Sequence, residues 1–290
     1  MTSMLTQTVK EQMDRFVLNG PYNATPDLGG TRVSDAPVVG VARADDPLWE
    51  KLKEPDVVGP HHLTPKQWLA GAKSVVSYFL PLSEPIRSSN RGPDPSAAWV
   101  HSRYSCEILV CAVRNFLIDT FEAAGARAMA PYFDRRFADP NWRANWSERH
   151  VAFVAGLGTL SLNGSLITRV GSAGRIGSVI VDMELEPTVR LYQDFDEYCT
   201  KCGACIRRCP PAALTERGRD NVLCLGQIRD NRLRTEGRGQ CQPFPHCENP
   251  SCPTRRSVAA GCGKCQAGVP CESGIPSRPA GAVPLLQTSA

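Results

Sequence analysis

Hydrophobic and polar positions in the first two thirds of the chain follow the periods of helices and strands. Residues 4–16 and 102–124 carry apolar side chains at helical spacing, and Gly125 can end the longer of these helices. The apolar runs at 37–42 and 74–80 are typical of buried strands. We therefore expect a layered sheet with helices packed against it.

Weaker patterns predict further strands, one more helix and a long loop. Residues 164–170 and 176–182 predict two strands, and Thr64 before Pro65 predicts the start of a helix. Residues 83–95 are rich in Pro, Ser, Gly and Asn, which predicts a loop.

The composition is that of a globular protein. The chain has 290 residues, of which 42% are hydrophobic and 21% charged, and its formal net charge is +4. These values exclude global disorder, and so mild a charge does not by itself indicate nucleic-acid binding. The N-terminus lacks the apolar run of a secretory signal, and no stretch approaches the ~18 apolar residues of a membrane span. We expect a cytoplasmic protein without a membrane or nucleic-acid partner.

Cysteine divides the chain into two parts. Of thirteen cysteines, Cys106 and Cys111 lie on the predicted long helix and eleven fall between Cys199 and Cys271. We expect the first two to be small core residues, since free cysteine is commonly buried. Thiols stay reduced in the cytoplasm, so the dense set is expected to bind metal rather than to form disulfides. The segment that carries it would be held together by that metal.

Four cysteines have the spacing of bacterial ferredoxins, in the run Cys199-x2-Cys202-x2-Cys205-x3-Cys209 followed by Pro210. Three thiolates on one tight loop can reach three irons of a [4Fe-4S] cubane, while the fourth points away and ligates a second cluster. The proline helps to turn the chain away from the site. The alternative, two zinc-binding pairs, does not need the fourth cysteine and the proline at this offset.

A second cluster needs further ligands, and the chain supplies them. Cys262 and Cys265 form another CxxC pair, Cys271 follows them, and Cys224 lies between the two sets. The crossed ligation of ferredoxins then assigns the cysteines to two [4Fe-4S] clusters. Cluster one takes Cys199, Cys202, Cys205 and Cys271, and cluster two takes Cys209, Cys224, Cys262 and Cys265.

Three cysteines are left over, Cys241, Cys247 and Cys252, with His246 beside the second of them. Three thiols and an imidazole can make a small zinc site. Alternatively, these residues are substitute cluster ligands, or free thiols in a loop that shields the clusters.

Positive charge accumulates around the cysteines. Residues 201–256 carry eleven Lys or Arg against five Asp or Glu. This excess favours a docking face for an acidic electron donor, reduced ferredoxin or flavodoxin, which the charge would steer to the protein. Alternatively, it offsets the negative charge of clusters ligated by thiolates.

Several stretches together resemble the epoxyqueuosine reductases and their relatives, the reductive dehalogenases. The cysteines follow the family's order, and the resemblance covers roughly residues 35–275. Residues 65–76 are similar to the family's motif ahead of a core strand. Glu148-Arg149 and residues 155–158 are similar to its glycine-rich signature, and residues 171–182 to the strand that follows it.

The resemblance implies a fold and a set of cofactors. It implies an α+β protein with a nitroreductase-like α/β core in residues 1–190, a ferredoxin-like domain with two [4Fe-4S] clusters in residues 191–276, and a flexible tail in residues 277–290. It also implies a cobalamin between the two domains, next to one cluster. Electrons would pass from the donor through both clusters to the corrinoid and the substrate.

Three features set the chain apart from the reductases that act on tRNA. The last cysteine set is CxxC-x5-Cys271 rather than CxxCxxxCP, and Trp142 stands where a gapless count puts their catalytic aspartate. We also expect the protein to be without the helical-repeat extension with which those reductases grip tRNA. We therefore expect a short subgroup of oxidoreductases that reduce a small molecule or a bound corrinoid. The alternatives are an electron-transfer protein that serves a partner enzyme, and a true epoxyqueuosine reductase.

A reductase needs a proton source, because electrons arrive singly and products take up protons. We expect Tyr104 to be the donor, with Asp139 as the second candidate. The polar residues expected to line the cleft of the core are His101, Arg103, Tyr104, Tyr132, Asp134, Asp139, Arg149 and His150.

Gly156 and Gly158 are expected to bind the cofactor, since glycine lets the backbone approach a flat ring system. The same stretch fails the dinucleotide fingerprint GxGxxG, because Ser161 replaces its third glycine. We therefore do not expect NAD binding.

Overall fold

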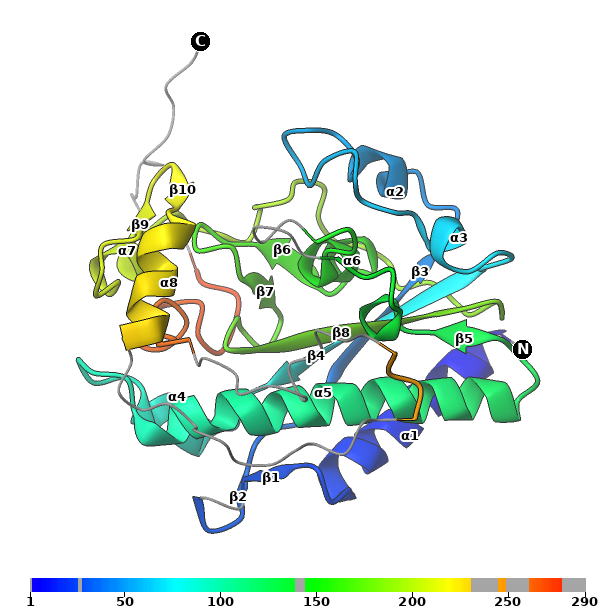
Figure 1. The fold of residues 1–290 in the computed structure, drawn as a ribbon, viewed down its shortest axis with the longest axis horizontal. Helices are drawn as coiled ribbons and strands as arrows, with labels where there is room; N and C mark the ends of the chain where they lie inside the picture. Colours follow the sequence, from blue (N-terminus) through cyan, green and yellow to red (C-terminus); the bar gives the residue numbers. More distant parts are fainter. Residues whose placement is uncertain (1, 26–27, 139–143, 231–244, 249–260, 278–290) are drawn as a thin grey trace.

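A four-stranded antiparallel sheet forms the centre of the protein (Figure 1). Its strands run in the order β3 (Val38–Arg43), β4 (Ser74–Pro81), β8 (Gly174–Val181) and β5 (Ala128–Met129). All eight residues of β4 are buried, because helices cover both faces of the sheet, and this explains its unbroken apolar run. The computed structural model describes residues 2–25, 28–138, 144–230, 245–248 and 261–277 of the chain.

Helices pack on both faces of the sheet. α5 (Ala97–Ala123) runs along one face with α1 (Thr2–Asn19) against it, and α6 (Glu148–Val154) lies on the other (Figure 1). Alternate side chains of β4 enter two cores, with Val76 on the α5 side and Val75 on the α6 side. Among the described helices, none combines the length and the apolar character that crossing a membrane requires.

The remaining elements are short. Antiparallel pairs are formed by β1 (Ala24–Thr25) with β2 (Thr31–Arg32), β6 (Gly158–Leu160) with β7 (Leu166–Thr168), and β9 (Leu214–Thr215) with β10 (Gly218–Arg219). The short helices are α2 (Leu48–Lys51), α3 (Pro65–Trp68), α4 (Glu84–Ser89), the 3-10 helix η2 (Pro131–Phe133), α7 (Ala204–Arg207) and α8 (Asn221–Asp230). α4, α7, α8 and residues 261–277 gather at one end of the sheet (Figure 1).

The mixed helix-and-sheet class and the predicted strands and helices are confirmed, with shifted boundaries. α5 begins at Ala97, ahead of its predicted start, because Ser96 Oγ accepts a hydrogen bond from the Trp99 backbone N–H and caps the helix. Cys106 and Cys111 are fully buried on this helix, as predicted.

The predicted loop at residues 83–95 is wrong in part, because α4 forms within it. The helix begins after Ser83 and carries Pro85 in its first turn, where the missing N–H of proline is tolerated. It buries Ile86 in the core on the α5 side, and this packing gives the short helix its stability.

A buried lysine joins the cysteine-rich segment, which runs from Cys199 to Cys271, to the core. Lys264 is 1% exposed and donates from Nζ to the carbonyl oxygens of Asn90 and Gly92 at 3.0 Å each, and also to that of Asp94. Asn90 Nδ2 in turn donates to the carbonyl oxygen of Cys262 at 3.0 Å. Lysine is almost never fully buried unless it is paired, so these bonds fix the segment against the loop that follows α4.

A buried carboxylate makes a second joint nearby. Glu272 accepts hydrogen bonds from Arg91 at 2.7 Å and from the Gly268 backbone N–H at 2.6 Å. Burial alone would raise the pKa of Glu272, but these bonds outweigh it and lower the pKa.

Gly263, with φ +66°, lies against Trp99 of α5, where a Cβ atom would fall 1.9 Å from the indole ring. The backbone of the CxxC loop therefore rests directly on α5.

We predict that Lys264→Met weakens the attachment of residues 261–277 by about 3 kcal/mol, because it leaves buried carbonyls without a donor. Hydrogen–deuterium exchange of the purified protein should become faster in residues 83–95 and 261–277 and stay unchanged in the sheet. Lys53→Met removes a lysine whose ion pair with Glu50 is partly exposed, and this control should have little effect. Unchanged exchange in Lys264→Met would contradict the role given to this lysine.

Aromatic side chains form a cluster on the α6 side of the sheet. Trp146 stacks on Trp49 and on His62, with ring centroids 5.6 and 5.7 Å apart, and Trp68 meets it edge-on. His62 is fully buried, and neither of its ring nitrogens has a hydrogen-bond partner among the described residues. Burial therefore lowers the pKa of His62 to about 4, with His61 contributing.

We predict that His62 makes the fold less stable in acid. In the unfolded chain its imidazole takes a proton near pH 6.5, whereas the folded protein holds it neutral down to about pH 4. The unfolded state therefore binds more protons as the pH falls through this window, and the free energy of unfolding falls by up to ~1.4 kcal/mol per pH unit.

The variant His62→Phe keeps the stacked ring and removes the titrating group. In urea unfolding between pH 6.5 and 5, the free energy of unfolding should fall less steeply in this variant than in the wild type, by up to ~1.4 kcal/mol per pH unit. His61→Phe controls for the added apolar volume. An equally steep fall in His62→Phe would show that other groups cause the acid sensitivity.

Candidate functional site

A cavity of about 760 Å³ opens between the core and the cysteine-rich segment. α5 contributes one wall, α6 and the turn before it a second, and the start of β8 a third. Arg219, Asn221 and Gln266 of the cysteine-rich segment complete the lining. The charged residues of the lining are Asp56, Arg103, Glu107, Arg114, Glu148, Arg149, Arg175 and Arg219.

Two ion pairs lie in the cavity wall. Arg103 Nη1 is 2.8 Å from Glu107 Oε2 one helical turn away, and Arg114 Nη2 is 2.8 Å from Glu148 Oε1 at the start of α6. Ser178 of β8 donates to the other oxygen of Glu148 at 2.6 Å. The second pair therefore ties α5, α6 and β8 together at the cavity.

The two glutamates differ in acidity. Burial would raise the pKa of Glu107, but the guanidinium groups of Arg103 and Arg114 outweigh it, and the pKa lies below its usual value. Burial raises the pKa of Glu148 above its usual value in spite of Arg114 and Ser178. Glu107 therefore stays ionised at neutral pH, while Glu148 takes up a proton more readily than an ordinary glutamate.

The imidazole of His150 is neutral at physiological pH. Burial, with Arg149 and His62 contributing, lowers its pKa to about 3. Its Nδ1 lies 2.7 Å from Ser147 Oγ, and its ring meets Phe195 edge-on. This ring can form hydrogen bonds within the cavity, but it cannot act there as a cationic proton donor.

One group of cysteines, Cys199, Cys202, Cys205 and Cys271, lines a single pocket. Burial raises the pKa of Cys205 to about 11, and the other three thiols add to this effect through like charge. The backbone N–H of Ser172 donates to the Cys271 carbonyl oxygen at 2.8 Å, and its hydroxyl lies 3.6 Å from Cys271 Sγ. A cysteine from far along the sequence thus stands among three thiols of the first run.

A second group of cysteines lies beside the first and consists of Cys209, Cys224, Cys262 and Cys265. Burial raises the pKa of Cys265 to about 12, with Cys262 and Cys224 next in effect. Burial is also the main cause of the raised pKa values of Cys224 and Cys262, and the like charge of Cys209 raises both further. Cys205 of the first group also acts on Cys265, so the two groups adjoin.

Gln266 connects the second group to the cavity. It follows Cys265 in the chain, lines the cavity, and donates to Ser165 Oγ at 2.9 Å and to the Ser172 carbonyl oxygen at 3.0 Å. Asn163 Nδ2 donates to the carbonyl oxygen of Cys265 at 2.5 Å. These bonds place the second group at the edge of the cavity.

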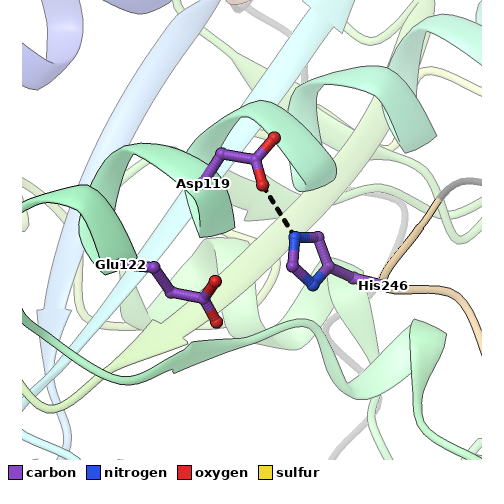
Figure 2. A group of neighbouring side chains, drawn as sticks. All are labelled: Asp119, Glu122 and His246. Atoms are coloured by element: carbon purple, nitrogen blue, oxygen red, sulfur yellow. Dashed lines mark hydrogen bonds and ion pairs between the residues drawn. The ribbon is translucent and has the colours of Figure 1, made fainter.

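The cysteine sulfurs are spread more widely than the ligands of one zinc ion. Thiolates around a tetrahedral zinc lie about 3.8 Å from one another. Among the described residues, the only three metal-binding side chains whose ligand atoms all lie within 4.8 Å are Asp119, Glu122 and His246 (Figure 2). His246 Nε2 is 2.8 Å from Asp119 Oδ1.

The leftover cysteines do not form a zinc site within the part of the chain that the structure describes. Cys247 is buried in the core on the α5 side, while its neighbour His246 turns to Asp119 on α5 (Figure 2). Cys241 and Cys252 lie outside the described residues. A zinc site made by all three thiols stays a prediction.

The two residues expected to donate protons have different outcomes. Tyr104 lies on α5 next to Arg103, one step further around the helix, and is not part of the cavity lining. Asp139 lies outside the described residues. Both roles stay predictions.

Of the other polar residues expected in the cleft, the lining includes Arg103, Tyr132, Arg149 and His150, but not His101 or Asp134.

Gly156 and Gly158 lie outside the cavity lining and pack against the chain itself. Gly158 has φ +154°, and a Cβ atom there would fall 1.9 Å from the Ile167 carbonyl oxygen. Gly156 has φ +81° and lies against the side chain of Thr188. Both glycines permit close contacts between backbone segments, and their role in cofactor binding stays a prediction.

Sequence analysis missed Glu107, Arg114 and Arg175 as cavity residues. A signal for the first two was present, because Arg103, Glu107 and Arg114 recur at helical spacing on an otherwise apolar helix. Charged side chains that share one face with core residues indicate a polar site on that face. Arg175 gives no such signal, since it lies at the start of a strand.

Comparisons with known proteins give matches among solved structures alone, since no protein-family profile and no curated protein matches the chain. An epoxyqueuosine reductase from Bacillus subtilis, seen with its catalytic loop swung out of the active site, matches with a TM-score of 0.52 at 19% identity, over 94% of this chain and 67% of that one. An epoxyqueuosine reductase with an epoxyqueuosine-modified tRNA-Tyr stem loop gives 0.52 at 20% identity over the same shares. A reductive dehalogenase linked to B12-dependent dehalogenation gives 0.45 at 15% identity, over 67% of this chain and 27% of that one.

The chain spans about two thirds of the length of the two reductases. At these identities the likeness shows a common fold and leaves the activity of the chain open. The resemblance predicted from the sequence motifs is confirmed at that level, because this chain shares the fold of the epoxyqueuosine reductases over almost its whole length.

Proposed function

We propose that the protein is an iron–sulfur oxidoreductase in which electrons pass through two [4Fe-4S] clusters to a small-molecule substrate or a bound corrinoid in the cavity. The observation that carries this proposal is the cavity of about 760 Å³ beside the second cysteine group. A protein that only relays electrons to a partner needs clusters near its surface, and has no need of a large polar cavity next to one of them. The cavity therefore favours an enzyme.

Ferredoxin-type crossing assigns Cys199, Cys202, Cys205 and Cys271 to one cluster and Cys209, Cys224, Cys262 and Cys265 to the other. The chemistry of these donors supports the assignment. Buried thiols that raise one another's pKa are stable as thiolates only around the positive charge of a metal. When bound, the two clusters supply low-potential transfer of single electrons.

The family likeness supplies the finer architecture of the proposal. On this basis we propose a nitroreductase-like core in residues 1–190, a ferredoxin-like domain in residues 191–276 and a tail in residues 277–290. We propose a cytoplasmic location, because thiols as dense as these stay reduced there. Cobalamin in the cavity rests on the likeness alone, and the visible spectrum of the protein after addition of cobalamin tests it.

The first cysteine group is assigned to the entry of electrons and the second to their delivery. Cys202 is exposed, whereas Cys265 lies next to a residue of the cavity wall. Arg207 and Arg217 are exposed beside the first group in the sequence and favour an acidic donor, reduced ferredoxin or flavodoxin. Steering by charge predicts that reduction by such a donor slows as salt is added.

Tyr132 is proposed as the proton donor of the cavity. Its ring lies in the lining with the guanidinium carbon of Arg114 4.2 Å from the ring centroid. A cation at this distance stabilises the phenolate that remains after the proton has been given up. Tyr104 and Asp139 keep their place as alternative donors.

A reductase that acts on tRNA is the second candidate. One structure with this fold is that of an epoxyqueuosine reductase with a modified tRNA stem loop, and this observation favours testing tRNA as a substrate. An electron-transfer protein without a substrate of its own is a third candidate, against which the cavity counts.

We predict about eight irons per chain after anaerobic purification, as two cubane clusters require. Cys209→Ser should lower this number by about half, because the cluster at Cys262 and Cys265 loses a ligand while the other keeps four. Cys106→Ala, at a buried cysteine outside both groups, is the control and should retain all the iron. About four irons in the wild type would disprove the two-cluster assignment.

We predict that Tyr132→Phe slows the reduction of a probe that takes up protons, such as nitrobenzene, by about 100-fold. Reduction of both clusters by dithionite should stay unchanged, since that step takes up no proton at Tyr132. Tyr104→Phe is the matched control from the same part of the core. If the probe reacts at the wild-type rate in Tyr132→Phe and slowly in Tyr104→Phe, the donor is Tyr104.

A further inference from the structure

Arg175 is a cation of the cavity wall that forms no ion pair with any of the residues that the structure describes. It lies at the start of β8, where its Nη1 donates to the Gly174 carbonyl oxygen at 2.8 Å. Its Nε is buried and has no hydrogen-bond partner in the part of the chain that the structure describes. Burial, with Arg103 adding to it, lowers the pKa of Arg175 to about 10, so the guanidinium group is still charged at pH 7.

The other arginines of the cavity are bound to groups of the protein. Arg103 and Arg114 form the two ion pairs with glutamates. Arg149 donates to the Gly164 carbonyl oxygen at 3.0 Å, and Arg219 Nε donates to Asn221 Oδ1 at 2.9 Å. Once the two ion pairs are set aside, Asp56 is the one acidic residue that remains in the described lining against three arginines. The wall therefore carries an excess of positive charge.

The thiol of Cys265 is the member of the second cysteine group that acts on the charge of Arg175. Among the groups that act on the charge of Arg175, the thiol of Cys265 has a smaller effect than Cys106, Glu107 or Arg103. A guanidinium group that is partly withdrawn from water without a counter-ion is in an unfavourable state. The arrangement is therefore most stable when the occupant of the cavity is negatively charged.

We propose that the cavity takes a ligand with an anionic group, a carboxylate or a phosphate ester, and that Arg175 binds this group. The inference rests on the proposed function, which places the ligand in the cavity, and it adds the chemical class of that ligand. Nε and a terminal nitrogen of a guanidinium group match the two oxygens of such an anion. Phe79 and Ile176, which also line the cavity, provide apolar surface for the rest of the ligand.

The anion can come from two sources that share this chemistry. One is a substrate that carries the group itself. The other is the phosphate in the nucleotide tail of a corrinoid, if a corrinoid occupies the cavity. Cobinamide lacks this phosphate and cobalamin has it, so the pair separates the two sources.

The test measures binding to the anaerobic protein with its clusters in place. Titration calorimetry with benzoate, inorganic phosphate, cobalamin and cobinamide compares the wild type with Arg175→Gln. We expect at least one of benzoate, phosphate and cobalamin to bind the wild type, and Arg175→Gln to weaken that binding about tenfold or more. Arg175→Lys, which keeps the charge and loses the fork, should fall between the two.

Two controls isolate the effect. Benzamide, a neutral relative of benzoate, should bind both proteins equally. Arg169→Gln removes the same charge from an exposed position outside the cavity lining and should leave all affinities unchanged. A loss of cobalamin binding with unchanged binding of cobinamide assigns the anion to the corrinoid, and a loss of benzoate or phosphate binding alone assigns it to the substrate.

The proposal is overturned if none of the anions binds, or if all bind Arg175→Gln as tightly as the wild type. The iron content and dithionite reduction of each preparation are measured alongside. Missing clusters would defeat the proposed function whatever the anions do, whereas intact clusters with binding indifferent to Arg175 would defeat only this inference.

Discussion

The geometry of the cavity depends on the buried ammonium group of Lys264. It holds the CxxC loop on the backbone carbonyls of residues 90–94, and Glu272 makes a matching contact with Arg91 a few residues later. Gln266 lies between these two contacts and forms part of the cavity wall. The position of the second cysteine group relative to the cavity is thus set by two buried charges whose hydrogen bonds are satisfied.

This reliance on polar contacts follows from how little apolar surface the cysteine-rich segment has to bury. Of its described residues, Ala267 and Cys247 are those that join the main core. A segment with so few apolar anchors needs directional bonds to the core and, in the proposed function, metal ligands to hold its own turns together. The core supplies rigid partners for these hydrogen bonds, since its sheet is covered by helices on each face.

The parts of the structure that the sequence predicted are those set by local pattern. β4 and α5 follow from continuous apolar periodicity. Tyr104 could not be placed, because one step along a helix turns a side chain by about 100° and the packing of α5 on the sheet decides which face meets the cavity. The burial of Lys264 was equally hidden, since lysine is expected at the surface and its partners lie far earlier in the chain.

α5 supports the site from its first turn to beyond its middle. Trp99 packs against Gly263 of the CxxC loop. Further along the same helix, Arg103, Glu107 and Arg114 line the cavity. A helix of 27 residues is about 40 Å long and does not bend as a linker between domains would. It acts as a spacer of fixed length between the thiols and the occupant of the cavity. In the proposed function, electrons would cross a gap of fixed length, and the difference in reduction potential between donor and acceptor would govern how fast they do so.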